Sequence, residues 1–184
     1  ITHRYPEDRI FAEEDGLRSP ISEGSVWVID PIDGTNNFVT QKEDFAVMVA
    51  YFEDGIGRFG LIYDVMRDHL FFGGGEFPVY RNEVELTPFV DQPLENLLIA
   101  SNVGMLEKND WGMADLGMDS LGIRVYGSAG ISFSKILSGG ILAYFSYIWP
   151  WDYAAAAIMG ERLGYTVLNL NGDKPNYQTV EPIM

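Results

Sequence analysis

Cysteine is absent from this 184-residue chain, and histidine occurs only at His3 and His69. A disulfide framework is therefore excluded, and a zinc site, which needs cysteine or histidine ligands, is disfavoured. The lack of cysteine also fits a cytoplasmic location. Basic residues are few, since 12 lysines and arginines stand against 27 aspartates and glutamates, for a net charge of −15. No basic stripe offsets that charge, so we do not expect nucleic-acid binding.

Long apolar runs are also missing from the sequence. The longest, ILAYFSYIWPW (141–151), is too short to span a bilayer and contains Pro150, so we expect no membrane segment. The composition, 47% hydrophobic and 14% aromatic, is that of a chain able to build one substantial core. Most of the acidic residues are expected to be solvent-exposed charge that keeps the protein dispersed.

Strand patterns dominate the first part of the chain. SVWVID (25–30), DFAVMVAYFEDG (44–55) and FGLIYDVMRDHLFFGGG (59–75) carry the alternation and turn signals of a meandering antiparallel sheet. From residue 129 the pattern changes to a helix (129–140), a strand (141–148), a second helix and the strand TVLNL (166–170). This alternation predicts layered α and β structure.

The segment WVIDPIDGTNNF (27–38) places two carboxylates three residues apart after a buried strand. Pro31 is expected to end that strand because it lacks a backbone donor. Asp30 and Asp33 can then converge on one ion, with the Ile32 carbonyl between them, and oxygen ligands of this kind suit magnesium, calcium or manganese. The alternative is an ordinary strand and turn, in which Asp30 only starts an Asx-turn.

A third carboxylate stands before an alanine-rich stretch in WPWDYAAAAIMGERLG (149–164). Asp152 is expected to be the N-cap of a buried helix that ends near Gly164. At a helix N-terminus the partial positive charge would keep the carboxylate ionised and able to bind a cation.

Three segments together resemble the inositol monophosphatase family of magnesium-dependent, lithium-sensitive phosphatases. These are DPIDGTNNF (30–38), WDYAAAAIMGERLGY (151–165) and FAEEDG (11–16), where Ala12 replaces the glycine of the family's Gly-Glu-Glu. The resemblance covers nearly the whole chain. It implies a metal-dependent phosphomonoesterase acting on inositol monophosphate or a similar polyol or sugar phosphate, without a covalent phosphoenzyme.

The resemblance also implies a role for each site residue. Two or three Mg²⁺ ions would be bound by four carboxylates and one backbone carbonyl: Glu13, Asp30, Asp33, Asp152 and Ile32. The catalytic groups would be Glu13, Thr35 and Asp33, with Glu13 and Thr35 holding the attacking water in line with phosphorus. The phosphate and the alcohol part of the substrate would contact a further set of groups: Asp33, the amides of Gly34 and Thr35, the backbone at Gly127, Ser128 and Ala129, and Asp152.

The fold implied by the family is an αβαβα sandwich of the sugar phosphatase type. It would divide into a strand-rich part, residues 1–124, with the FAEEDG and DPIDGT motifs, and an α/β part, residues 125–184, with the WPWD motif. The family likeness also implies a homodimer. In family terms Ile1 lies well inside the protein, so a helical N-terminal stretch is expected to precede it.

Phe145 stands where inositol-hydrolysing members carry a glutamate that bonds a ring hydroxyl. Either substrate preference is shifted away from inositol phosphates or Phe145 is a core residue of the strand. Other activities are therefore open, namely a fructose 1,6-bisphosphatase or a nucleotide 3′-phosphatase of the same superfamily. A catalytically silent metal-binding or interaction protein is an alternative of another class.

Overall fold

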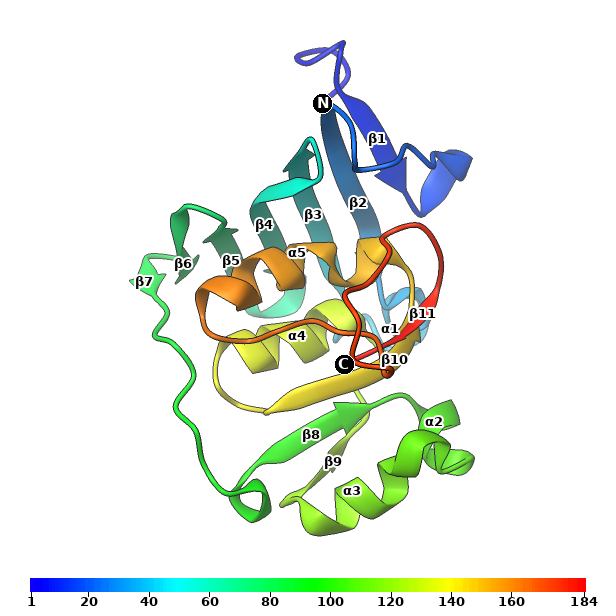
Figure 1. Ribbon diagram of the computed structural model, residues 1–184, viewed down its shortest axis with the longest axis vertical. Coiled ribbons are helices and arrows are strands. Elements are labelled where there is room, and N and C mark those ends of the chain that lie inside the picture. The colour runs from blue at the N-terminus through cyan, green and yellow to red at the C-terminus, as the bar shows by residue number, and fades with distance from the viewer.

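The computed structural model describes residues 1–184 apart from the side chain of Asp15. Its larger sheet has seven strands in the order β1 to β7 (Figure 1). Their bounds are β1 (Arg9–Ala12), β2 (Ser25–Asp33), β3 (Ala46–Glu53), β4 (Ile56–Asp64), β5 (His69–Gly74), β6 (Phe77–Arg81) and β7 (Val84–Glu85). β1 runs parallel to β2, and every later neighbour is antiparallel. The predicted antiparallel meander is thus confirmed for β2 to β7.

The smaller sheet has the order β11-β10-β8-β9. Its strands are β8 (Leu98–Ser101), β9 (Gly122–Arg124), β10 (Ala143–Ile148) and β11 (Glu181–Ile183). The α-helices are α1 (Thr35–Thr40), α2 (Val103–Glu107), α3 (Met113–Asp119), α4 (Ala129–Leu137) and α5 (Pro150–Arg162). Short 3₁₀ turns are η1 (Glu14–Gly16), η2 (Val65–Arg67), η3 (Leu94–Asn96) and η4 (Asp110–Gly112).

These elements form four layers: the larger sheet, the pair α4 and α5, the smaller sheet, and the pair α2 and α3 (Figure 1). The described residues therefore supply the βαβα part of the predicted αβαβα sandwich. The division at residue 124 stays a prediction. None of the described helices is long and apolar enough to cross a membrane.

The main core lies between the larger sheet and α5. Along β3 the strand period turns Ala46, Met48, Ala50 and Phe52 toward the helices, and all four are buried. Close approach of α5 depends on glycine in the facing strand, because a Cβ added to Gly60 would stand 2.3 Å from the Ala155 carbonyl oxygen. This contact holds the middle of α5 close to β4, and the helix also contacts β2.

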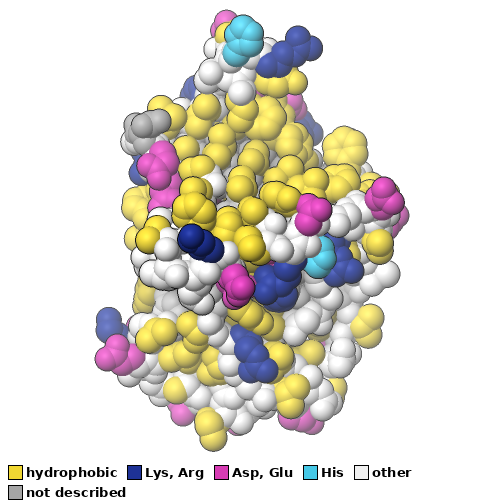
Figure 2. Space-filling view, turned by 180° about the vertical axis from the view of Figure 1, so that it is seen from behind, with side chains coloured by type: hydrophobic (Ala, Val, Ile, Leu, Met, Phe, Trp, Pro, Cys, Tyr) yellow, Lys and Arg dark blue, Asp and Glu magenta, His cyan; other side chains and the backbone are white. Residues whose placement is uncertain are grey.

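The opposite face of the larger sheet is apolar and carries no helix among the described residues. Figure 2 shows this face from behind as a broad hydrophobic surface. Five of the side chains that line a shallow depression there are Phe59, Leu61, Leu70, Phe72 and Tyr80. An antiparallel sheet that leaves one face in solvent usually carries polar side chains there, so this face is unusually apolar.

Three local predictions were wrong. β2 continues through Pro31 to Asp33, with a register shift between Asp30 and Asp33 instead of a strand end. The segment 166–170 is no strand: it lies along the outer edge of β11 and bonds to residues 182 and 184, but forms only an isolated bridge, Asn169 to Ile183. Asp152 is not an N-cap, since α5 begins at Pro150 and Trp149 is its N-cap. Pro is favoured at the first helical position, where its missing N–H is not needed.

Candidate active site

The bulge in β2 and the first turn of α5 bring three carboxylates together. Asp30, Asp33 and Asp152 each offer one oxygen, and these atoms lie within 4.8 Å of one another. Asp30 and Asp33 are buried, and Asp152 is half-buried. Two of the three come from one strand because the register shift between Asp30 and Asp33 turns both side chains inward. We refer to these three residues as the aspartate triad.

Asp33 is held by the N-terminal end of α4. Its Oδ1 accepts a hydrogen bond from the Ala129 amide at 3.0 Å, and its Oδ2 accepts one from the Gly130 amide at 2.8 Å. The Ser128 hydroxyl donates to the same Oδ2. A Cβ on Gly130 would lie 3.1 Å from that oxygen, so glycine leaves room for the carboxylate at the helix end.

The other two triad members are anchored by nearby backbone amides. Asp30 Oδ1 accepts from the Ile32 amide at 3.0 Å, and Asp152 Oδ2 accepts from the Trp149 amide at 2.7 Å. Asp152 therefore caps α5 from its third position, reaching back to the residue before the helix. The carboxylate predicted at the positive end of this helix is present, but at the third helical position and not at the N-cap. The expectation that the helix end keeps it ionised is wrong for the metal-free protein, because burial raises the pKa of Asp152 to about 7.

Burial and mutual repulsion disfavour the charged forms of the triad. Burial raises the pKa of Asp30 to about 9, and the nearby charges of Asp33, Asp152 and Glu13 add to the shift. Burial, with the charge of Asp33, raises the pKa of Asp152 to about 7. The pKa of Asp33 is raised by burial and held back by its hydrogen bonds from Ser128, Gly130 and Ala129.

The triad has the donor chemistry that a hard divalent cation requires. The three carboxylate oxygens lie close together. Among the described residues, these three side chains are the group of histidine and acidic residues that could bind one ion together. A cation there would favour the ionised carboxylates and so oppose the effects of burial and repulsion that raise the three pKa values. Mg²⁺ would fit Asp30, Asp33 and Asp152, with more than one ion requiring further ligands.

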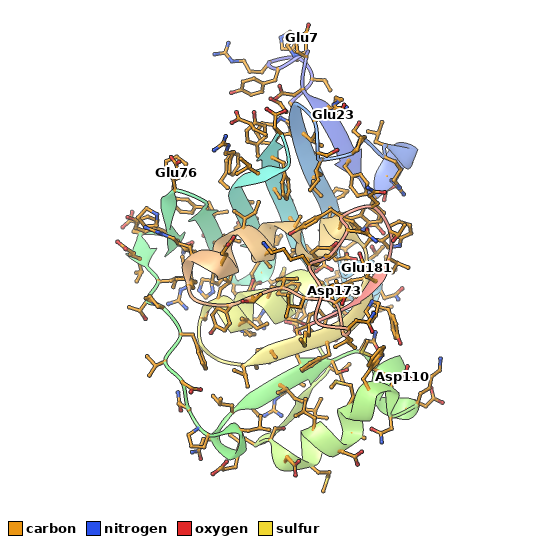
Figure 3. The ribbon with its side chains drawn as sticks, in the orientation of Figure 1. Glu7, Glu23, Glu76, Asp110, Asp173 and Glu181 are labelled. Carbon is orange, nitrogen blue, oxygen red and sulfur yellow. The ribbon has the colours of Figure 1, made fainter. Side chains whose placement is uncertain are left out.

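Most of the remaining acidic residues are distributed over the surface. Figure 3 labels six that stand in turns and loops or at the first residue of a short element: Glu7, Glu23, Glu76, Asp110, Asp173 and Glu181. Glu7, Glu23, Glu76 and Asp173 are exposed, as expected from the sequence, whereas Asp110 and Glu181 are half-buried.

Glu13 stands beside the triad but outside it. It follows β1 directly, its side chain is exposed, and its amide donates to the Ile29 carbonyl at 3.3 Å. It is near enough that its charge contributes to the raised pKa of all three aspartates. The residue therefore lies at the open side of the cluster, where a second ion or a water molecule could be reached.

Thr35 and Ile32 are joined to each other. The Thr35 hydroxyl donates to the Ile32 carbonyl oxygen at 3.0 Å, and the hydroxyl is exposed. Gly34 is the N-cap of α1 and adopts φ 83°, a conformation that favours glycine. A Cβ there would lie 2.9 Å from the Cβ of Ser128, so this turn packs directly on the start of α4.

Ser128 and Ala129 donate to Asp33 of the triad, and Asn37 secures the segment just before them, since a Cβ on Gly127 would lie 3.1 Å from its side chain. The predicted contact of residues 127–129 with substrate stays a prediction. The side-chain nitrogen Nδ2 of Asn37 donates hydrogen bonds to the backbone carbonyl oxygens of Asp44 at 2.9 Å and Tyr126 at 2.7 Å. Asn37 was not singled out from the sequence, where it is one of two adjacent asparagines in DGTNNF. Its burial inside an otherwise exposed helix is visible only in three dimensions.

Phe145 is a core residue. It is buried with Ile99, Met105 and Met113 in the cluster between the smaller sheet and α2 and α3. The core alternative for this position is therefore the correct one. Its neighbour Tyr144 faces the other side of β10, where burial raises the pKa of its hydroxyl and the charges of Asp33 and Asp152 add to the shift.

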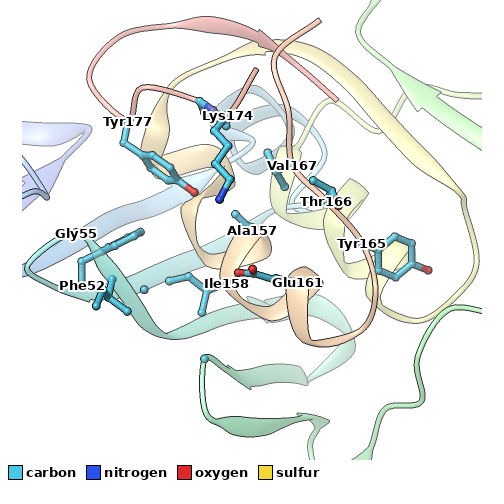
Figure 4. Close-up of a pocket in the computed structure, with 14 residues that line it drawn as sticks. Phe52, Gly55, Ala157, Ile158, Glu161, Tyr165, Thr166, Val167, Lys174 and Tyr177 are labelled. Carbon is cyan, nitrogen blue, oxygen red and sulfur yellow. The ribbon is translucent and has the colours of Figure 1, made fainter. Parts of the chain in front are cut away.

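A separate pocket of about 350 Å³ lies toward the opposite end of α5 (Figure 4). It is bordered by the β3–β4 turn, the second half of α5 and the loop after it, with Lys174, Glu161 and Tyr177 at its wall. None of the predicted site residues lines it. The candidate active site is thus the open cluster at the start of α5, not this pocket.

Comparison with known proteins gives a consistent family assignment. The model of the inositol monophosphatase family matches residues 1–184. Inositol-1-monophosphatase of Bacillus subtilis (strain 168) is 37% identical over 179 residues, which cover 94% of this chain and 68% of that protein. Across the first curated relatives the chain spans about two thirds of the relative's length, with shares of 68% and 64% for two of them.

Two solved structures show the same fold. SaIMPase-II, an inositol monophosphatase-II from Staphylococcus aureus, has a TM-score of 0.93 at 33% identity, covering 100% of this chain and 72% of its own. It has been solved with 2′AMP and with inositol monophosphate bound. An IMPase/NADP phosphatase solved with Mg²⁺ and phosphate has a TM-score of 0.90 at 26% identity, covering 99% of this chain and 69% of its own. The predicted α/β sandwich of the sugar phosphatase type is confirmed.

Proposed function

Because the chain belongs to the inositol monophosphatase family, we propose that it is a Mg²⁺-dependent phosphomonoesterase acting on inositol monophosphate or a similar polyol or sugar phosphate. The observation that carries the proposal is the aspartate triad, whose three oxygens lie within 4.8 Å of one another. The charge of the chain supports it as well. With a net charge of −15, the protein attracts a phosphate monoester only where cations reverse the local field.

Two or three Mg²⁺ ions are proposed, held by Asp30, Asp33 and Asp152 together with Glu13 and the Ile32 carbonyl. Bound Mg²⁺ supplies Lewis-acid stabilisation of the phosphoryl oxygens and lowers the pKa of water. The solved IMPase/NADP phosphatase with Mg²⁺ and phosphate supports this choice of cation.

The chain's own groups would orient the attacking water. The Thr35 hydroxyl already donates its hydrogen to the Ile32 carbonyl, so its oxygen is left to accept a hydrogen bond. The exposed carboxylate of Glu13 would accept the second water proton. With both protons engaged, a lone pair on the water oxygen would face phosphorus, while the amides of Gly34 and Thr35 hold the phosphate. Attack would form a P–O bond to the water oxygen as the P–O bond to the alcohol breaks, with one water proton passing to Glu13 and the departing alcohol oxygen taking a proton from solvent.

The alcohol part of the substrate is proposed to contact Asp33, Asp152 and the backbone at 127–129. A nucleotide phosphatase is a second candidate, because the relative SaIMPase-II has been solved with both 2′AMP and inositol monophosphate. Phe145 offers no means of choosing between them, since it packs in the core. A fructose 1,6-bisphosphatase would likewise differ from these two candidates only in the alcohol part of its substrate.

Three further expectations accompany the family assignment. We propose that the whole protein is a cytoplasmic homodimer and that lithium inhibits it. A catalytically silent metal-binding protein would share the triad but would release no phosphate.

The proposal is tested by measuring phosphate release with Mg²⁺ and with EDTA, using inositol 1-phosphate, fructose 1,6-bisphosphate, 2′AMP and adenosine 3′,5′-bisphosphate. We expect turnover that requires Mg²⁺ and falls steeply in Asp30→Asn. Asp119→Asn, which removes an exposed carboxylate at the end of α3, is the matched control and should retain full activity. Release from no substrate by a folded, Mg²⁺-bound protein would favour the silent alternative.

A further inference from the structure

Arg18 makes an unusual set of contacts at the edge of the candidate site. Its guanidinium carbon lies 4.5 Å from the ring centroid of Trp151, 5.6 Å from that of Trp149 and 5.7 Å from that of Phe11. The two tryptophan rings are themselves stacked, with centroids 4.8 Å apart and planes 8° apart. Distances of this size are those of cation–π contacts, which favour the planar guanidinium of arginine.

The same guanidinium also forms hydrogen bonds across the loop 12–18, which carries Glu13. Arg18 Nη1 donates to the carbonyl oxygens of Ala12 and Leu17, and the Ala12 amide donates to the Leu17 carbonyl at 3.1 Å. Phe11 and Arg18 also form an isolated antiparallel bridge. The two ends of the loop 12–18 are thus tied together by one side chain.

The two tryptophans belong to a segment far away in the chain. Trp149 and Trp151 flank Pro150 at the start of α5, and the Trp149 amide is the donor that holds Asp152 Oδ2. One side chain therefore joins the loop of Glu13 to the helix start that bears Asp152. Glu13 is exposed and lies outside the triad, so its position depends on how this loop is fastened.

We propose that Arg18 is a positioning residue that fastens the Glu13 loop to Trp149 and Trp151 and thereby sets the place of Glu13 relative to the aspartate triad. The inference rests on the proposed function, because Glu13 matters only if the cluster binds Mg²⁺. It assigns Arg18 a role through Glu13, not a contact with substrate or metal.

The test compares Mg²⁺ binding by titration calorimetry in the unaltered protein and in Arg18→Gln, Arg18→Lys and Arg162→Gln. Removal of one exposed cation–π clamp is expected to weaken Mg²⁺ binding by roughly fivefold in Arg18→Gln. Arg18→Lys keeps the charge but not the planar stacking group, so we expect it to recover little of the affinity. Arg162 lies in the last turn of α5, away from Asp152, and Arg162→Gln should bind Mg²⁺ like the unaltered protein.

A double-mutant cycle with Glu13→Gln decides whether Arg18 acts through Glu13. If it does, Arg18→Gln weakens Mg²⁺ binding in the unaltered background and adds nothing in the Glu13→Gln background. A merely structural role would lower the melting temperature and leave the Mg²⁺ affinity unchanged. Circular dichroism of each variant establishes that it is folded, and Arg18→Lys carries the comparison if Arg18→Gln fails to fold.

Three results would overturn the positioning role alone: unchanged affinity in Arg18→Gln, full recovery in Arg18→Lys, or additive losses in the double variant. The second would mean that only the positive charge matters. A chain that binds no Mg²⁺ in any form would instead overturn the proposed function, and the role of Arg18 with it.

Discussion

The aspartate triad and Glu13 are proposed to serve one metal cluster, yet the protein builds them in different ways. Asp30 and Asp33 are buried in β2, which has a strand on either side, and Asp152 lies in the first turn of a helix packed across the larger sheet. Glu13 is exposed on a loop beside β1, the edge strand of that sheet. The triad is therefore fixed by the main core, whereas Glu13 is fixed by a few local contacts.

This difference separates the consequences of changing the two parts. A buried carboxylate that accepts hydrogen bonds contributes both to metal binding and to the stability of the fold. An exposed carboxylate on a loop contributes little to stability. Substitutions in the triad should thus change activity and stability together, and substitutions at Glu13 should change activity alone.

Asp33→Asn should have the largest effect. Loss of one anionic ligand removes several kcal/mol of transition-state stabilisation, so we expect turnover to fall by about a thousandfold. The asparagine side chain keeps one acceptor oxygen, so its NH₂ group would face either the Ala129 or the Gly130 donor, at a cost of about 1–3 kcal/mol in stability. Phosphate release and thermal unfolding measure the two effects. The control is Asp173→Asn, an exposed loop residue, and retained turnover in Asp33→Asn would contradict the assignment.

The metal-free protein should lose stability as the pH rises from 6 to 9. The pKa of Asp30 is raised to about 9 and that of Asp152 to about 7, so the folded state keeps protons that the unfolded state has lost. Stability is then greatest at low pH and falls up to the folded-state pKa, by at most about 1.4 kcal/mol per pH unit for each group.

Melting curves in EDTA and in excess Mg²⁺ test this pH dependence. Mg²⁺ stabilises the ionised carboxylates, so it should raise the melting temperature more at pH 9 than at pH 6. Asp30→Asn should reduce the slope in EDTA because it removes the group with the higher pKa. A metal-free protein whose stability increases over this range would show that the triad is not held in a protonated state.

Glu13→Gln should show most clearly how the loop residue Glu13 differs from the aspartate triad. We expect Mg²⁺ affinity and turnover to fall by roughly ten- to a hundredfold. Because the side chain is exposed, the free energy of unfolding should change by less than about 0.5 kcal/mol. Calorimetric titration and thermal unfolding provide the measurements, with Glu14→Gln as the neighbouring exposed control. A large loss of stability would mean that Glu13, like the triad, is held in place by the main core.

The sequence predicts the parts of this site that are local in the chain. The spacing of Asp30 and Asp33 after a β-branched strand, and the carboxylate at the start of an alanine-rich helix, indicate oxygen ligands near a helix N-terminus. The antiparallel meander follows from the strand period. Where local rules compete, prediction is less exact, since Pro150 displaces the N-cap from Asp152 to Trp149.

Contacts between distant segments could not be predicted in this way. The bonds from the start of α4 to Asp33 join residues 95 to 97 apart, and the bond from Asn37 to Tyr126 joins residues 89 apart. Neither pattern nor propensity specifies such pairs, because each depends on how the two sheets and the helices between them pack. The same holds for Arg18, whose partners Trp149 and Trp151 come together with it only in the folded chain.

Ser128→Ala should have the smallest effect and test the link between the triad and α4. Ser128 caps α4 by accepting from the Ile131 amide at 3.1 Å, and its hydroxyl donates to Asp33 Oδ2. Loss of the cap should cost about 1 kcal/mol, and loss of a donor should raise the pKa of Asp33 further and weaken Mg²⁺ binding a few-fold.

Ser134→Ala is the matched control, because this buried serine of the same helix donates to the Gly130 carbonyl instead. Equal losses of Mg²⁺ affinity in both variants would mean that the hydroxyl acts through the helix as a whole. A loss confined to Ser128→Ala would mean that α4 affects Mg²⁺ binding through the hydrogen bond from Ser128 to Asp33. That result is expected if the main core fixes the position of the triad.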